Sequence, residues 1–207
     1  MSDETEVDAA HDANADHNAE DDASADRNAE DDADSDELRE NVGQRFGRLP
    51  ATPADREVAG RASREEVLNF FFERFGIDPS VFDSVTFWEK GKGKIWVFAD
   101  DVPSPLRVEG LGMTVLRTRQ EHWKPTHSAV QRFGRHATKN VIELDSEAAA
   151  TFVRGEDQEL DWDGDWGYLI VTHRFAGASE PIGVGLYLYG ELRSTVPKGN
   201  REELSVL

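Results

Sequence analysis

The sequence predicts an α+β protein, in which a small α+β unit is followed by a small β-barrel and preceded by a disordered acidic tail. Three observations predict this fold class: a repetitive acidic composition over the first 40 residues, one helical pattern followed by a hairpin pattern, and a series of short strand patterns punctuated by glycines. We therefore divide the chain into a tail over residues 1–40, a linker over 41–61, an α+β unit over 62–119 and a β-barrel domain over 120–207.

The tail holds most of the negative charge of the chain. Residues 1–40 contain 17 acidic residues and two arginines, a net charge of −15 out of the formal −19 of the whole chain. The motif "NAEDDA" occurs at residues 18–23 and again at 28–33. Such a segment cannot bury enough apolar surface to offset its ordering entropy. We expect a disordered tail that keeps the protein soluble, with an acidic arm that binds a basic partner as the alternative.

The linker is expected from its prolines and glycines, although "VGQRFGRLP" at residues 42–50 could also fold onto a partner or onto the domain. The folded part of the chain is expected to begin at Ser63. There, Ser-Arg-Glu-Glu forms a capping box, which predicts the start of a helix that ends at Gly76. Alternating apolar residues over 85–98, around "EKGKG", predict a hairpin. The sequence "LRVEGLGMTVLRTR" at residues 106–119 adds one or two further strands.

The second unit is expected to contain short strands and one short helix. Strands are predicted in "NVIELD", "GYLIVTH" and "PIGVGLYLYGEL", and a helix in "SEAAATFVRG". Gly183 and Gly185 indicate a strand that passes close to another backbone or to RNA, with a β-bulge at a barrel corner as the alternative. The acidic loop over 156–165 contains "DWDG", which resembles the start of a calcium loop but lacks the bidentate glutamate, so a solvated loop is expected.

Composition excludes several classes of protein. No apolar run is long enough to span a membrane and the N-terminus is acidic, so we expect a cytoplasmic protein without a membrane partner. The absence of cysteine excludes disulfides, thiolate metal sites and a thiol nucleophile. Arginine outnumbers lysine by 17 to 6 and the sequence pI is about 4.6, a composition expected of an extreme halophile.

One segment has the opposite charge. Residues 117–139, here called the basic segment, contain six Lys and Arg residues and the single acid Glu121, with histidines, Trp123 and Phe133 between them. Cations hold phosphates and flat rings stack on bases, so this pattern indicates a nucleic-acid surface. The alternative is that the aromatic residues belong to the core and the charges form an ordinary solvated face.

The second unit resembles a known family. "AAATFVRGED" followed by "PIGVGLYLYGELRSTVPKGNR" resembles a PUA domain, a pseudobarrel of RNA-modifying enzymes and ribosome-assembly factors. "KPTHSAVQRFGRHATKN" and the closing "VPKGNR" look like the C-terminal RNA-binding region of archaeal Sun-family RNA cytosine-5 methyltransferases, and the unit over 62–119 would match their pre-PUA module. The resemblance implies binding of structured RNA, tRNA or rRNA, in RNA modification or ribosome assembly.

The same resemblance argues against catalysis. Sun-family methyltransferases use a cysteine nucleophile and bind S-adenosylmethionine on a doubly wound domain, and this chain has no cysteine and no G-x-G-x-x-G after a strand. We therefore expect a non-catalytic protein with no cofactor and no metal that binds RNA, with an RNA-modifying enzyme or a ribosome-assembly factor as a further partner. The alternatives are a protein-interaction adapter or accessory subunit of an RNA methyltransferase, and a PUA-like nucleic-acid-processing hydrolase.

The expected RNA-binding residues come from the basic segment, the glycine-punctuated strand and the closing motif. They are Lys124, His127, Arg132, Arg135, Lys139, Asn140, Gly183, Gly185, Lys198 and Arg201. In PUA-type barrels the last strand returns beside the first, so the basic segment and the closing motif are expected on one face.

Overall fold

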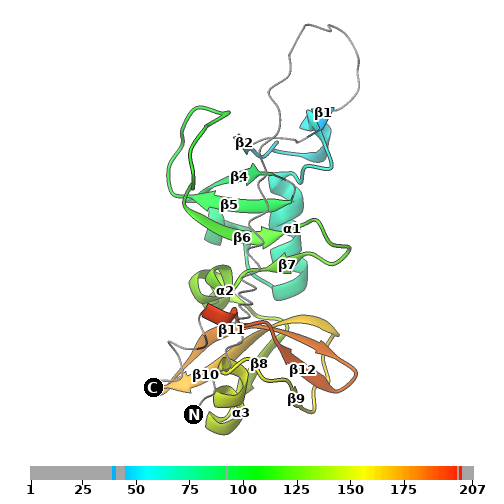
Figure 1. Ribbon diagram of the computed structural model, residues 1–207, viewed down its shortest axis with the longest axis vertical. Coiled ribbons are helices and arrows are strands. Elements are labelled where there is room, and N and C mark those ends of the chain that lie inside the picture. Colours follow the sequence, from blue (N-terminus) through cyan, green and yellow to red (C-terminus); the bar gives the residue numbers. More distant parts are fainter. Residues whose placement is uncertain (1–38, 41–44, 92, 200, 202–207) are drawn as a thin grey trace, which may run out of the picture. The chain divides into compact units, whose positions relative to one another are not determined.

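The computed structural model describes residues 39–40, 45–91, 93–199 and 201. The predicted disordered tail lies outside the described residues, except for strand β1 (Arg39–Glu40), which pairs in parallel with β3 (Val58–Ala59). The described chain is α+β, as predicted, with two five-stranded sheets and few helices (Figure 1). No helix in this part of the chain is long and apolar enough to cross a membrane.

The first sheet is antiparallel throughout. Its strands, in spatial order, are β2 (Phe46–Arg48), β4 (Thr86–Lys90), β5 (Lys94–Phe98), β6 (Met113–Arg117) and β7 (Lys124–Pro125). Strands β4 and β5 confirm the predicted hairpin. The stretch over 106–119 contributes β6 alone, because the residues before Gly112 form a loop.

Helix α1 (Arg64–Phe75) begins and ends where the sequence predicts. The Ser63 hydroxyl accepts a hydrogen bond from the Glu66 amide at 3.2 Å, and the Glu66 carboxylate accepts one from the Ser63 amide at 2.7 Å. This reciprocal pair satisfies two amides that a helix start leaves free. At the other end Gly76 adopts a φ of +64°, which favours glycine. A 3-10 helix, η2 (Pro79–Phe82), follows.

Both faces of the first sheet are covered at β4 and β5, because adjacent residues on these two strands belong to different clusters. Phe87 and Ile95 pack with α1 in the main core, whereas Trp88 and Trp96 lie in a second cluster with Phe46. The loop between β5 and β6 covers this second cluster with apolar side chains. A sheet covered on both faces retains few exposed apolar side chains.

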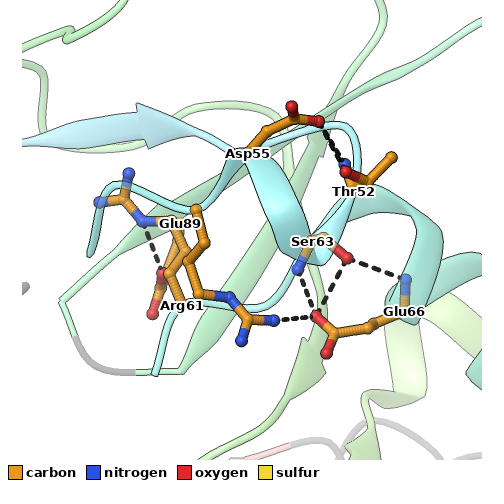
Figure 2. A network of polar contacts seen from close by, with 7 residues as sticks. Thr52, Asp55, Arg61, Ser63, Glu66 and Glu89 are labelled. Carbon is orange, nitrogen blue, oxygen red and sulfur yellow. Dashed lines mark hydrogen bonds and ion pairs between the residues drawn. The ribbon is translucent and has the colours of Figure 1, made fainter. Parts of the chain in front are cut away.

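The linker predicted over residues 41–61 is wrong for its described part. Phe46 is fully buried in β2, and Leu49 is buried in the main core. Arg61 donates to the Glu89 carboxylate at 3.0 Å, and Figure 2 shows this pair beside the capping network of Ser63 and Glu66. The alternative that "VGQRFGRLP" folds onto the domain therefore holds for residues 45–50, because its two apolar side chains fit the core despite the linker-like composition.

The second sheet is a curled half-barrel. Its strands, in spatial order, are β8 (Val141–Leu144), β10 (Gly167–Phe175), β11 (Ala178–Leu188), β12 (Glu191–Ser194) and β9 (Gln158–Glu159). Strand β8 runs parallel to β10, and the other neighbours are antiparallel. Helix α3 (Ser146–Val153) buries Phe152 against this sheet. The strands predicted in "NVIELD" and "GYLIVTH" and the helix are thus present, whereas "PIGVGLYLYGEL", predicted as one strand, contains parts of two antiparallel strands, β11 and β12, joined by a turn at Tyr189 and Gly190.

A helix within the basic segment joins the two sheets. Helix α2 (His127–Phe133), extended by the 3-10 helix η3 (Gly134–His136), buries Val130 and Phe133 in the main core. That core also contains Ile170 and Val184 of the second sheet together with α1 and the first sheet. The main core therefore joins the two predicted units, while the second sheet and α3 also have a separate buried cluster that contains Phe152 and Leu169.

Candidate nucleic-acid interface

The basic segment begins with a row of cations on three adjacent strands. Arg117 of β6 lies directly opposite Lys94 of β5 on one side and Lys124 of β7 on the other. Like charges opposite one another destabilise a sheet. Burial, with added repulsion from Arg117, lowers the pKa of Lys124. The three side chains, here called the cation row, form a site that an anion would stabilise.

Further cations lie on and after α2. The Thr126 hydroxyl caps this helix by accepting from the Ala129 amide at 3.1 Å. Arg132 and Arg135 are exposed at the other end of the helix, where the partial negative charge of the C-terminus stabilises cations. Lys139 is exposed and its Nζ lies 5.4 Å from the centroid of the Phe72 ring on α1. These three predicted residues are accessible to a ligand.

No cation of the basic segment has a carboxylate partner among the described residues. Eight arginines elsewhere have an acidic oxygen within 4.0 Å. The unpaired residues of the basic segment are Arg117, Arg119, Lys124, Arg132, Arg135 and Lys139. Other described cations, such as Arg107 and Lys198, also lack a carboxylate partner within the described chain, but the basic segment groups six of them within residues 117–139.

Three predicted binding residues have structural roles. Asn140 has a φ of +52° and its Nδ2 donates to the Arg74 carbonyl at 2.7 Å, so it connects β8 to the end of α1. Gly183 and Gly185 are buried in β11, and a Cβ at Gly183 would lie 2.3 Å from His127 Cε1. Each glycine makes room for a side chain, His127 or Leu192, which gives it a packing role, and its contact with RNA stays a prediction.

His127 lies partly buried at the start of α2, between that helix and β11. Its Nε2 is 3.5 Å from the Thr195 hydroxyl. Burial lowers its pKa, and the nearby Lys124 charge acts in the same direction. A neutral, enclosed imidazole is unsuited to a phosphate contact. His127 therefore positions α2 against the second sheet.

The closing motif is only partly adjacent to the basic segment. The His127–Thr195 contact brings the start of α2 to the residue before "VPKGNR". Lys198 is exposed, whereas Arg201 donates through Nε to the Val196 carbonyl at 3.0 Å and its guanidinium lies against Gly155. Arg201 thus lies beside the end of α3, whereas Lys139 lies beside α1. The contacts within the described chain do not place these two residues next to each other.

A groove lined by aromatic side chains borders the cation row, and the sequence analysis missed it. It encloses about 800 Å³ and is lined by Phe70, Arg74, Gln120, Glu121, His122, Trp123, Trp166, Gly167, Tyr168, Leu186 and Leu188. Lys124 Nζ lies 5.9 Å from the centroid of the Tyr168 ring. Trp166 directly follows the loop over 156–165, which was expected to be merely acidic and solvated. The two tryptophans in "DWDGDW" were the available signal.

Comparison with known proteins gives two family matches. Residues 139–201 match the family described as "Methyltransferase RsmF PUA domain", and residues 29–112 match a "Family of unknown function (DUF7122)". The chain is also 26% identical over 159 residues to "Ribosomal RNA small subunit methyltransferase F" of Aeromonas salmonicida (strain A449). That alignment covers 74% of this chain and 30% of the relative, so the chain spans less than a third of its length. The second sheet with α3 therefore resembles the PUA domain of ribosomal RNA methyltransferases, which confirms the resemblance to the C-terminal region of the Sun family.

Proposed function

We propose that this chain is a non-catalytic RNA-binding protein that recognises structured RNA, tRNA or rRNA, through the basic segment. The match to a PUA domain supports RNA binding in general, and the printed name of the relative supports ribosomal RNA as one target. The role proposed is targeting or assembly, in RNA modification or ribosome biogenesis. The chemistry of the relative is not carried over, since the chain contains no cysteine to act as nucleophile.

The observation that carries this proposal is the set of unpaired cations, and above all the cation row. A row of three cations on adjacent strands without a counter-ion costs free energy in the isolated protein. Phosphate oxygens would relieve that repulsion, and arginine can bind them through two parallel hydrogen bonds. We also propose that the protein works at molar salt, where the Debye length is about 3 Å and recognition depends on such direct contacts.

Retention of RNA from a total extract tests the proposal. The purified chain is incubated with total RNA in molar KCl, and the retained RNA is sequenced beside that retained by a control protein of similar charge. Enrichment of tRNA or rRNA fragments is expected. Retention equal to the control would refute RNA binding.

The adapter alternative is tested in a parallel incubation, in which the chain is mixed with a cell extract that contains protein as well as RNA. Part of each sample is treated with nuclease before recovery. If the chain is an adapter, a protein partner from the extract stays bound after the RNA is destroyed. If it binds RNA directly, the RNA is recovered by the purified chain without any other protein.

A further inference from the structure

The aromatic groove offers a site for a base rather than for a phosphate. We propose that it binds an unpaired nucleobase of the RNA whose phosphates lie on the cation row. This inference rests on the proposed function and deepens it, because it assigns to one site the recognition of a single-stranded or bulged nucleotide.

The walls of the groove are flat rings held by the fold. Phe70 of α1 and Trp123 pack with their ring centroids 5.7 Å apart, and both belong to the border of the main core. Trp166 and Tyr168 line the groove from the start of β10, and Trp166 is 56% exposed. Aromatic rings fixed by packing can stack a base at little further cost in conformational entropy.

The distribution of charge favours a nucleotide over an apolar peptide. Arg74, which lines the groove, is already engaged: its Nε donates to the Tyr168 carbonyl at 2.9 Å and its Nη1 lies 3.8 Å from the Asp165 carboxylate. The unpaired cations lie at the border instead, where Lys124 approaches the Tyr168 ring. An apolar site bordered by unpaired cations complements a base that is attached to a phosphate.

Hydrogen-bond donors for a base are also available. The indole N–H groups of Trp123 and Trp166 and the hydroxyl of Tyr168 make no hydrogen bond to any described residue. None of the three is buried without a partner, so each is open to solvent or to a ligand. The groove volume of about 800 Å³ lies within the range of small-molecule sites, which is roughly 300 to 1,000 Å³.

The test uses one exposed ring in the groove and a matched ring elsewhere. Trp166→Ala removes a groove wall, and Trp166→Phe restores a stacking surface. Phe175→Ala is the control, because Phe175 is 52% exposed at the opposite end of the same strand, β10. Affinity is measured for a short RNA hairpin with an unpaired loop, for the same hairpin with abasic loop nucleotides, and for the fully paired duplex.

Trp166→Ala is expected to weaken binding of the looped hairpin about 5- to 100-fold, in line with the loss of one stacked base. The same change should leave the affinity for the abasic hairpin and for the duplex unchanged. Trp166→Phe should recover most of the lost affinity for the looped hairpin, and Phe175→Ala should not change that affinity. If the intact protein binds the hairpin but Trp166→Ala and Phe175→Ala behave alike, or if the loss is equal with abasic RNA, this inference is overturned and the proposed function stands. If the intact protein binds none of the RNAs, the proposed function itself fails.

Discussion

Charged side chains are used in opposite ways in two regions of this chain. Around β2 and the start of α1 each arginine that joins the fold has an acidic partner: Arg48 with Asp101 at 2.8 Å, and Arg61 with Glu89 at 3.0 Å. In the basic segment no cation has one among the described residues. The first region uses charge to hold a segment in place, whereas the second leaves charge available for a ligand.

The difference has an energetic consequence. A buried charge that loses its partner is strongly destabilising, so the Arg61–Glu89 pair is part of the fold. Lys124 is partly buried with no counter-ion, and its lowered pKa reflects the cost of that position. The protein tolerates this cost at the place where a phosphate would remove it.

The largest expected effect is on stability, from Glu89→Gln. Glu89 is 2% exposed and accepts hydrogen bonds from Arg61 and from the Gly93 amide. Removing its charge leaves Arg61 without an anionic partner, and we expect the free energy of unfolding to fall by about 3 kcal/mol, the low end for a broken buried pair, since Arg61 keeps some contact with solvent. Denaturant unfolding measures the change.

The matched change is Glu156→Gln, which breaks the exposed pair with Arg154. Exposed pairs contribute about 0 to 1 kcal/mol, so stability should barely change. Equal losses for the two variants would mean that the charges around β2 do not hold the fold together. The first half of the contrast, that acidic partners hold the arginines around β2 in the fold, would then be wrong.

A smaller effect, on RNA affinity, is expected from charge reversal at exposed, unpaired lysines. Lys139→Glu and Lys198→Glu should each weaken binding by about 1 to 3 kcal/mol, through loss of a phosphate contact and added repulsion. Arg107→Glu is the control, because Arg107 is exposed and unpaired but lies in the loop between β5 and β6. Filter binding in molar KCl ranks the three. A dominant Arg107 with silent Lys139 and Lys198 would place the RNA on the loop between β5 and β6 instead.

The smallest expected effect is a pH dependence from His127. Because burial lowers its pKa in the folded protein, the unfolded chain binds a proton more readily than the folded one. Its contribution to stability is therefore full above the ordinary histidine pKa of about 6.5 and is lost as the pH falls below that value toward the folded pKa. Comparing melting temperatures of the intact protein and His127→Gln at about pH 8 and about pH 5 should show the smaller acid loss in the variant. An identical acid loss would mean that His127 is not enclosed between α2 and β11.

Local chemistry made much of the fold predictable from the sequence. The capping box at Ser63, the glycine at 76 and the alternation over 85–98 each depend on neighbouring residues, and each prediction is confirmed. Strand β2 was not predicted, because its place depends on whether the distant sheet has space for Phe46. Helix α2 was not predicted within the basic segment, and the burial of Phe133 agrees with the alternative in which the aromatic residues of this segment belong to the core.

The site was less predictable for the same physical reason. The exposed cations could be chosen from composition, and their role in binding stays a prediction. The cation row depends on strand register, which a bulge between Ile95 and Trp96 shifts, so Lys94 could not be grouped with Lys124 from the sequence. Gly183 was predicted to bind RNA because the sequence does not show that the side chain of His127 fills the space beside it.

The most direct test of the central claim compares two double charge reversals of equal size. Lys94→Glu with Arg117→Glu changes two exposed members of the cation row, whereas Arg174→Glu with Arg193→Glu changes two exposed arginines that already have acidic partners. RNA affinity in molar KCl should fall about 10-fold or more for the first double variant, given about 1 to 3 kcal/mol per phosphate contact, and change little for the second. Equal losses, or a larger loss in the second, would contradict the claim that the cation row binds RNA.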